Sequence, residues 1–169
     1  SPQSPTDRAV IKIWNVGRDG RLDMTDAQFH PHADNLSRFV LAANDVVMAM
    51  TGATVGKVAV VNESGVFLNQ RVGVLRARTG ALQTYIFHAL CNETFYKYCQ
   101  RTAGGGAQGN IASSQILEYE IPLPDLETQH AIVTEIEAEQ ALVAANRELI
   151  RRMEAKVKAA IDRVWGGAL

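Results

Sequence analysis

Basic and amide side chains gather in the middle of the sequence, where their chemistry would suit recognition of a nucleic acid. Between positions 57 and 101, Glu63 and Glu93 oppose six basic residues, Lys57, Arg71, Arg76, Arg78, Lys97 and Arg101. The amide side chains among and just beyond them are Asn69, Gln70, Gln108 and Asn110. Amides can pair with base edges, and arginine can pair bidentately with guanine. Surface arginines and amides are common, so this pattern indicates DNA contact without establishing it.

The motifs that would indicate an enzyme are incomplete. Residues 52–57, Gly-Ala-Thr-Val-Gly-Lys, resemble a phosphate-binding loop, but that motif has four residues between its glycines and Ser or Thr after the lysine. Here three residues separate the glycines and Val58 follows the lysine, so we interpret the segment as a hairpin turn. His30 and His32 have no third ligand nearby, which favours exposed loop histidines over a metal site. His88 is interpreted as a half-buried core residue. No catalytic triad has a recognisable spacing, so we predict neither catalysis nor a cofactor.

Composition indicates a globular protein. The 169 residues, 47% hydrophobic and 7% aromatic, suffice for one ordinary domain plus a long helix. No apolar run is long enough to span a membrane and no signal peptide opens the chain. Cys91 and Cys99 lack metal-site spacing, which favours a reducing, cytoplasmic location. A formal net charge of −1 excludes a protein that coats polyanions by bulk charge.

Short strands followed by helices would position the polar residues, which predicts an α+β fold. Apolar alternation and turn residues predict strands over Val10–Val16, Asp45–Met50, Lys57–Asn62 and Phe67–Arg78, the middle two forming a hairpin around Gly52 and Gly56. A helical pattern covers Leu82–Arg101, with a break near Asn92, and Gly104–Gly106 opens a flexible loop. We therefore expect a trimmed or disordered lead-in over 1–9 and a globular domain over 10–124.

The last quarter of the chain predicts one helix from Leu126 to Trp165, within a spacer segment 125–166 that Asp125 would cap. Its apolar seam repeats every seventh residue at Ile136, Val143, Ile150, Val157 and Val164, with Ile132 and Met153 on the facing heptad position. The first half of the helix carries glutamates and the second half is rich in Arg and Lys. Antiparallel copies would lay acidic halves along basic ones. A lone amphipathic helix packed on its own domain is the alternative, but a helix of roughly 50 Å overhangs a small domain.

The ordered set of motifs resembles the DNA-specificity (S) subunits of type I restriction-modification systems. The matching segments are 52–57, Asn69-Gln70-Arg71, 106–111, Ile121-Pro122-Leu123-Pro124 with Gln129, His130 and Ile132 after it, and 160–166. The resemblance implies a target-recognition domain that reads one half of a split DNA site. It also implies conserved helices that pair antiparallel and dock the methyltransferase subunits. Such subunits are not catalytic, and S-adenosylmethionine, Mg and ATP would be bound only by the methyltransferase and restriction partners.

Two departures from the family pattern qualify that resemblance. A complete S subunit has two recognition domains and two helices, whereas this sequence has one of each, so we expect a half-subunit or a fragment. Relatives also begin with a further strand and turn before the segment matching Val10–Val16. Two chains paired through their helices would restore both recognition domains and would read an inverted repeat.

Within each domain we predict DNA contact by seven residues. Lys57, Arg71 and Arg101 would contact phosphate, and Asn69, Gln70, Gln108 and Asn110 would contact base edges or position the residues that do. The alternative function is a coiled-coil module that binds protein rather than DNA.

Overall fold

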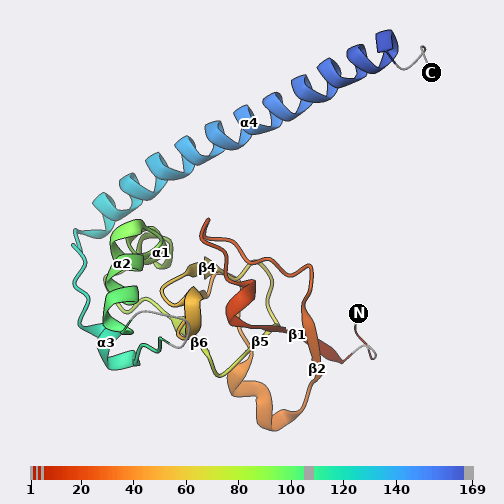
Figure 1. Ribbon diagram of the computed structural model, residues 1–169. Coiled ribbons are helices and arrows are strands. Elements are labelled where there is room, and N and C mark those ends of the chain that lie inside the picture. Colours follow the sequence, from red (N-terminus) through yellow and green to blue (C-terminus); the bar gives the residue numbers. More distant parts are fainter. Residues whose placement is uncertain (1, 3, 5, 105–108, 166–169) are drawn as a thin grey trace. The chain divides into compact units, whose positions relative to one another are not determined.

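Among the residues that the computed structural model describes, 2, 4, 6–104 and 109–165, the chain forms two small sheets, several short helices and one long helix (Figure 1). Two compact units divide it, Ser1–Gln129 and His130–Leu169, here called the N-terminal and C-terminal units. Both sheets and the short helices belong to the N-terminal unit. The predicted α+β class is confirmed.

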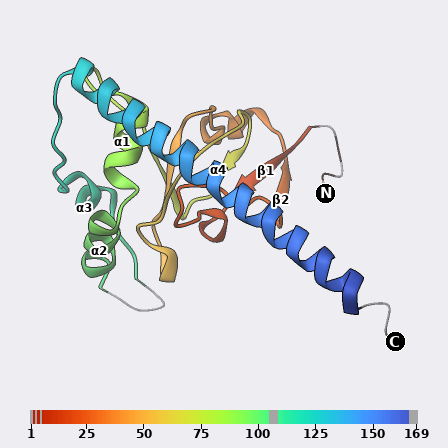
Figure 2. The same ribbon diagram turned by 90° about the horizontal axis from the view of Figure 1, so that it is seen from above.

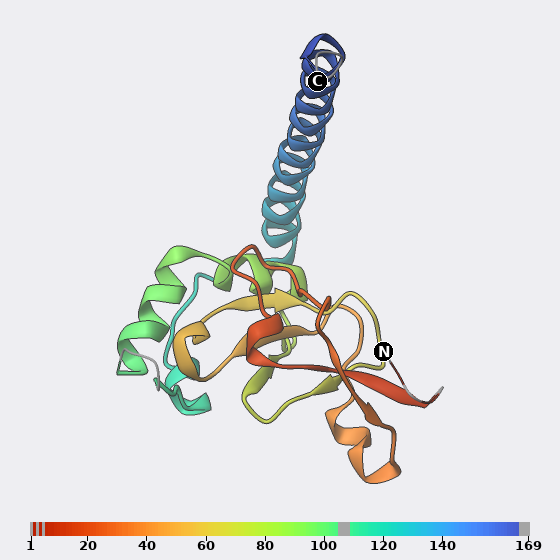
Figure 3. The same ribbon diagram turned by 45° about the vertical axis from the view of Figure 1, so that its right-hand side comes forward.

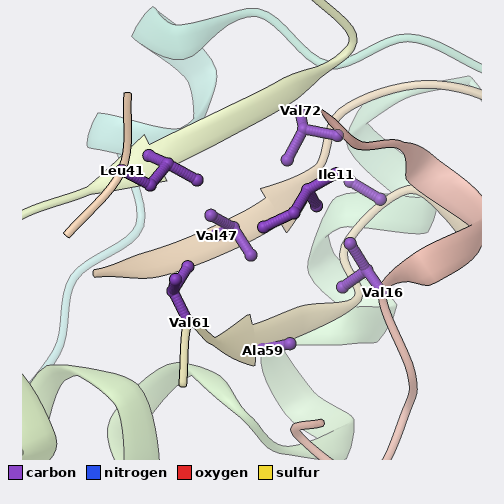
Figure 4. Close-up of a cluster of buried hydrophobic side chains, with 8 residues drawn as sticks. Ile11, Val16, Leu41, Val47, Ala59, Val61 and Val72 are labelled. Atoms are coloured by element: carbon purple, nitrogen blue, oxygen red, sulfur yellow. The ribbon is translucent and has the colours of Figure 1, made fainter. Parts of the chain in front are cut away.

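An antiparallel sheet in the order β4 (Val58–Val60), β3 (Val46–Ala49) and β6 (Val72–Leu75) lies at the centre of the N-terminal unit. All four residues of β3 are buried, because side chains alternate along a strand and both faces of this sheet are covered. Val47 packs in one core cluster with Ile11, Val16, Leu41, Val61 and Val72 (Figure 4). Val46 and Met48 pack in a second cluster with Leu90, Phe95, Cys99 and Ile111.

Each face of the central sheet is covered by a different layer. The second sheet, in the order β2 (Gln28–Pro31), β1 (Asp7–Ile11) and β5 (Phe67–Leu68), lies on the opposite side from the short helices (Figure 2). These helices are α1 (Gln83–Leu90), α2 (Glu93–Thr102) and α3 (Ser113–Leu117). Strand β1 pairs antiparallel with β2 and parallel with β5. The 3₁₀ helix η2 (Asp34–Phe39) follows β2 and lies far from α2 (Figure 3).

Several predicted elements are confirmed. Strands β3 and β4 form the predicted hairpin, and its Gly52 and Gly56 have φ angles of +72° and +85°. The predicted helix breaks at Asn92, whose side chain accepts a hydrogen bond from Phe95 N at 2.9 Å. Helix α4 runs from Leu126 to Trp165 as predicted, and Asp125 caps it by accepting from Thr128 N at 2.8 Å. Its 40 residues span about 60 Å rather than the roughly 50 Å expected.

Two predicted strands are wrong. Val10–Val16 is not one strand, because β1 ends at Ile11 and Ile13–Asn15 forms a 3₁₀ turn, η1. The Asn15 side chain makes this turn by accepting from Lys12 N and donating to Asp23 O, both at 2.8 Å. Phe67–Arg78 is likewise not one strand, since a turn at residues 69–71 sends β5 and β6 into different sheets.

Candidate nucleic-acid interface

The chain between β3 and β4, residues 50–57, is held by two segments distant in sequence, and we call it the apex loop. Met50 N donates to Arg71 O at 3.0 Å, and Ile111 N donates to Met50 O at 3.0 Å. Gly52 N donates to Gly109 O at 2.7 Å, next to an isolated antiparallel bridge between Thr51 and Asn110. The turn that carries Arg71 and the segment that carries Asn110 therefore meet at the start of the apex loop.

Helix α2 packs against the other end of the apex loop, and Figures 1 and 3 show η3 (Gly52–Thr54) beside it. Gln100 Nε2 donates to Val55 O at 2.7 Å. At Gly56 a Cβ atom would lie 2.6 Å from Cys99 Cβ, so the close approach of loop and helix requires glycine there. Arg101 follows Gln100 and is exposed. The loop and helix thus bring Arg101 into the same region.

Lys57 lies at the end of the apex loop in a recess of about 180 Å³, which Arg18, Asn92, Glu93 and Tyr96 also line. The Arg18 guanidinium stacks on the Tyr96 ring, 3.8 Å from its centroid, and forms an ion pair with Glu93. A stacked guanidinium presents its charge in a defined direction. The recess therefore holds two cations, Lys57 and Arg18, beside one carboxylate.

The seven predicted DNA contacts differ in their exposure. Gln70, Arg71, Arg101 and Asn110 are exposed, Lys57 and Asn69 are half-buried, and Gln108 lies outside the described residues. The Asn69 carboxamide oxygen accepts from Arg71 N at 3.2 Å, and Asn69 O accepts from Val72 N at 2.9 Å. Asn69 therefore shapes the turn that presents Arg71. Backbone bonds and packing thus place the segments that carry Arg71, Asn110 and Arg101 around the apex loop, which carries Lys57.

Arg76, a member of the basic cluster in the sequence, is engaged within the fold. Its Nε and Nη2 donate to the two carboxylate oxygens of Asp45 at 2.7 and 2.6 Å. Asp45 is almost fully buried and also accepts from Ala42 N at 2.9 Å. These donors, the Arg76 bond above all, lower the pKa of Asp45. The role of Arg76 is thus better explained by its bonds to Asp45 than by contact with DNA.

The histidines and cysteines of the described residues were candidates for metal binding or nucleophilic chemistry. No group of three His, Cys, Asp or Glu residues among those that the structure describes could hold a metal ion. His32 stacks on Phe67, with ring centroids 5.9 Å apart, and is exposed like His30. Burial raises the pKa of Cys91, and that of Cys99 to about 12. Both thiols are therefore protonated at neutral pH and are poor nucleophiles.

Helix α4 exposes the apolar seam that the heptad pattern predicted. Every residue from 137 to 165 is exposed, whereas Ile132 and Ile136 are half-buried. The exposed seam residues are Val143, Ile150, Met153, Val157 and Val164, and Leu142 and Leu149 flank them. No helix in the described part of the chain is long and apolar enough to cross a membrane.

Comparison with known proteins identifies the family. The profile for the type I restriction modification DNA specificity domain matches residues 27–155, more than half of the chain. The chain belongs to this family. The specificity domain is 26% identical over 168 residues to the type I restriction enzyme MjaVIII specificity subunit of Methanocaldococcus jannaschii. That alignment covers 94% of this chain and 39% of the relative, so the chain spans about two fifths of the relative's length.

Solved structures share the fold of the specificity domain. The HsdS subunit from Thermoanaerobacter tengcongensis has a TM-score of 0.65 at 22% identity, covering 94% of this chain and 42% of that one. A second structure describes the complex assembly and conformational transition of the type I R-M system. One of its chains has the same TM-score and identity. It covers 97% of this chain and 39% of that one. At this identity the likeness establishes the fold of the specificity domain.

Sequence reasoning overlooked Arg18 in this specificity domain. Arg18 lies in the turn after η1, far from the basic cluster in sequence, and lines the same recess as Lys57 because it stacks on Tyr96 and pairs with Glu93, both in α2. The signal that could have drawn attention to it is the turn Gly17-Arg18-Asp19-Gly20, whose glycines present a lone basic side chain.

Proposed function

We propose that this specificity domain recognises one half of a split DNA site for a type I restriction-modification complex. The observation that supports it most directly is the arrangement at the apex loop. Exposed Arg71, Asn110 and Arg101 lie on three segments that pack around the apex loop, which itself carries half-buried Lys57, and the chain belongs to the DNA specificity domain family. Lys57, Arg71 and Arg101 would hold phosphates, while Gln70, Asn110 and Gln108 would read or position base edges. Asn69 would act through the turn that it stabilises.

The long helix would carry the assembly function. The exposed seam of α4 needs an apolar partner, and a second copy running antiparallel would provide one. Glu127, Glu135, Glu137 and Glu139 lie in its first half, and Arg147, Arg151, Arg152, Lys156, Lys158 and Arg163 in its second, so antiparallel copies attract each other. A rod of about 60 Å exceeds the roughly 34–36 Å of one duplex turn. It is long enough to hold two readers about a turn apart.

The domain would act without catalysing a reaction itself. Its two-fold pair would present identical readers to an inverted repeat with a spacer between the half-sites. The helices would dock methyltransferase subunits, and restriction subunits would join these. S-adenosylmethionine, Mg and ATP would be held by those partners, and methylation and cleavage would take place there.

Methylation mapping tests the proposal. The chain would be co-expressed with a type I methyltransferase subunit from the same source, and every modified adenine would be mapped by sequencing. We expect one symmetric split motif. An asymmetric motif would mean that another chain supplies the second half-site, which would refute the homodimer. Co-purification without methylation would refute DNA reading by this domain.

A protein-interaction module without DNA binding is the second candidate, and the exposed seam of α4 favours it equally. Salt dependence separates the two. DNA affinity that depends on phosphate contacts falls steeply as salt rises, because binding releases counterions. Absence of DNA binding at low salt, together with seam-dependent dimers, would favour the interaction module.

A further inference from the structure

A buried glutamine at the base of the long helix joins three segments of the N-terminal unit. Gln129 is fully buried. Its Oε1 accepts from Leu82 N at 2.8 Å, and its Nε2 donates to Gly80 O at 2.9 Å and to Pro124 O at 2.7 Å. Burying a carboxamide without partners is costly, whereas here both amide hydrogens and the oxygen are bonded. Gln129 thus bonds the turn before α1, the extended segment before α4, and the first turn of α4 into one structure.

Gln83 continues these bonds to the central sheet. Its Nε2 donates to Leu75 O at 2.7 Å, and its Oε1 accepts from Ala77 N at 2.6 Å. The start of α1, which Gln129 holds through Leu82, is therefore held to the end of β6 as well. Strand β6 begins at Val72, directly after the turn that carries Arg71. We call Gln83 and Gln129 together the junction clasp, since they connect the strand after the proposed reading turn to the first turn of α4.

The first turn of α4 is built into the N-terminal unit, whose last residue is Gln129. Besides its side-chain bonds, Gln129 N donates to Asp125 O at 2.9 Å, within the turn that Asp125 caps. Gln129 precedes Ile136 by one heptad and so occupies the register of the apolar seam. A polar residue in that register belongs to the clasp rather than to a helix pair.

Small movements at the base of a long rod become large at its far end. For a helix of about 60 Å, a tilt of about 3° displaces the far end by about 3 Å, which is close to one base-pair step. Two readers joined through such helices keep a single spacing only if each helix is held firmly at its base. Resting on the function proposed above, we propose that Gln129 is a positioning residue that limits the spacer length accepted between the two half-sites.

The test maps modified adenines for four variants co-expressed with the methyltransferase subunit. Gln129→Met keeps the length of the side chain and removes all three bonds. Gln129→Glu keeps the acceptor and removes both donors. Gln140→Met is the matched control, because Gln140 is exposed on the same helix. Val61→Ala is a stability control, because Val61 is buried in a core cluster that contains neither Gln83 nor Gln129.

We expect the parental chain and both controls to methylate one spacer length. Both Gln129 variants should keep the parental half-site bases and raise methylation at spacers one base pair longer or shorter by about tenfold. That change corresponds to about 1.4 kcal/mol, which is within the loss expected when Glu removes two of the bonds and Met removes three. A fifth variant, Gln83→Met, lies on the sheet side of the clasp and should broaden the spacer likewise. It replaces the Gln129 variants in the test if these fail to fold.

Three results would overturn the proposal that the clasp limits the spacer length. They are an unchanged spacer in every clasp variant, altered half-site bases, and equal broadening by Val61→Ala, which would reduce the effect to lost stability. A parental chain that gives no split motif would instead refute the proposed function, so the two failures are distinguishable.

Discussion

The N-terminal unit buries a core of apolar side chains, whereas the distal part of helix α4 exposes its own. In the N-terminal unit β3 is buried over its whole length between two core clusters, whereas every residue of α4 from 137 to 165 is exposed. Burial of apolar surface is the main stabilising term in folding, and most helices in proteins are stabilised by packing. The residues that make the fold are therefore separate in sequence from those available for assembly.

Breaking the seam should have the largest effect and should leave the N-terminal unit folded. Replacing Ile150 and Val157 by Asp would bury charges in the proposed helix pair, raising its dissociation constant on the order of a thousandfold. Light scattering should then report a monomer, with the thermal transition of the N-terminal unit unchanged. Ala141→Asp with Ala155→Asp, exposed positions off the seam, is the control and should keep the dimer. An unchanged mass for the seam variant would remove the seam from the dimer interface.

A substitution in the core should have the opposite pattern of effects, because it should destabilise the N-terminal unit and leave dimerisation intact. Phe95 is fully buried and meets the Tyr119 ring at 4.9 Å between centroids, so Phe95→Ala should lower the free energy of unfolding by about 3–5 kcal/mol. Denaturant titration measures this loss, and Phe29→Ala in the exposed edge strand β2 is the control. Loss of dimerisation under conditions where the variant remains folded would contradict the separation of the two regions.

Removing the ion pair between Arg76 and Asp45 should have a smaller effect on the stability of the N-terminal unit. Arg76→Ala leaves the carboxylate of Asp45 with Ala42 N as its main donor, and should lower stability at neutral pH by about 1–3 kcal/mol. The folded-state pKa of Asp45 is lowered from 3.8, so its contribution is present above pH 3.8 and is lost as pH falls through the lower folded value.

Urea titrations of parent and variant across pH 2–7 would show the two converging at the acid end. Arg78→Ala, at an exposed neighbouring arginine, is the control for charge alone. A difference that persists undiminished at pH 2 would exclude the ionised carboxylate as its source.

The smallest effect should be on DNA binding by a single arginine at the apex loop. If Arg71 holds a phosphate, Arg71→Ala should weaken binding to all sequences alike and reduce the salt slope by about 1. Fluorescence anisotropy over a salt series measures both quantities, with Arg38→Ala in η2 as the control. A change in sequence preference would instead assign Arg71 to a base, and an identical binding curve would remove it from the interface.

Local patterns predicted much of the fold. Heptad spacing and the Asp125 cap marked helix α4, and Gly52 and Gly56 marked the hairpin, because such signals depend on neighbouring residues. The strand over Val10–Val16 was wrong because the Asn15 side chain bends the chain through a bond to Asp23, outside any short window. Strand β2 and helix α3 were missed, since one is an exposed edge strand and the other has only five residues.

The candidate site was partly predictable for the same physical reason. Residue types and spacing determined the list of basic and amide residues and the apolar seam of α4, since both are read directly along the chain. Only the tertiary structure decided which of them meet. Hydrogen bonds to Met50 and Gly52 bring in Arg71 and Asn110, Asp45 engages Arg76, and Tyr96 stacks under Arg18. These contacts, like the burial of Gln129, join residues far apart in sequence, and only the packed chain brings such residues together.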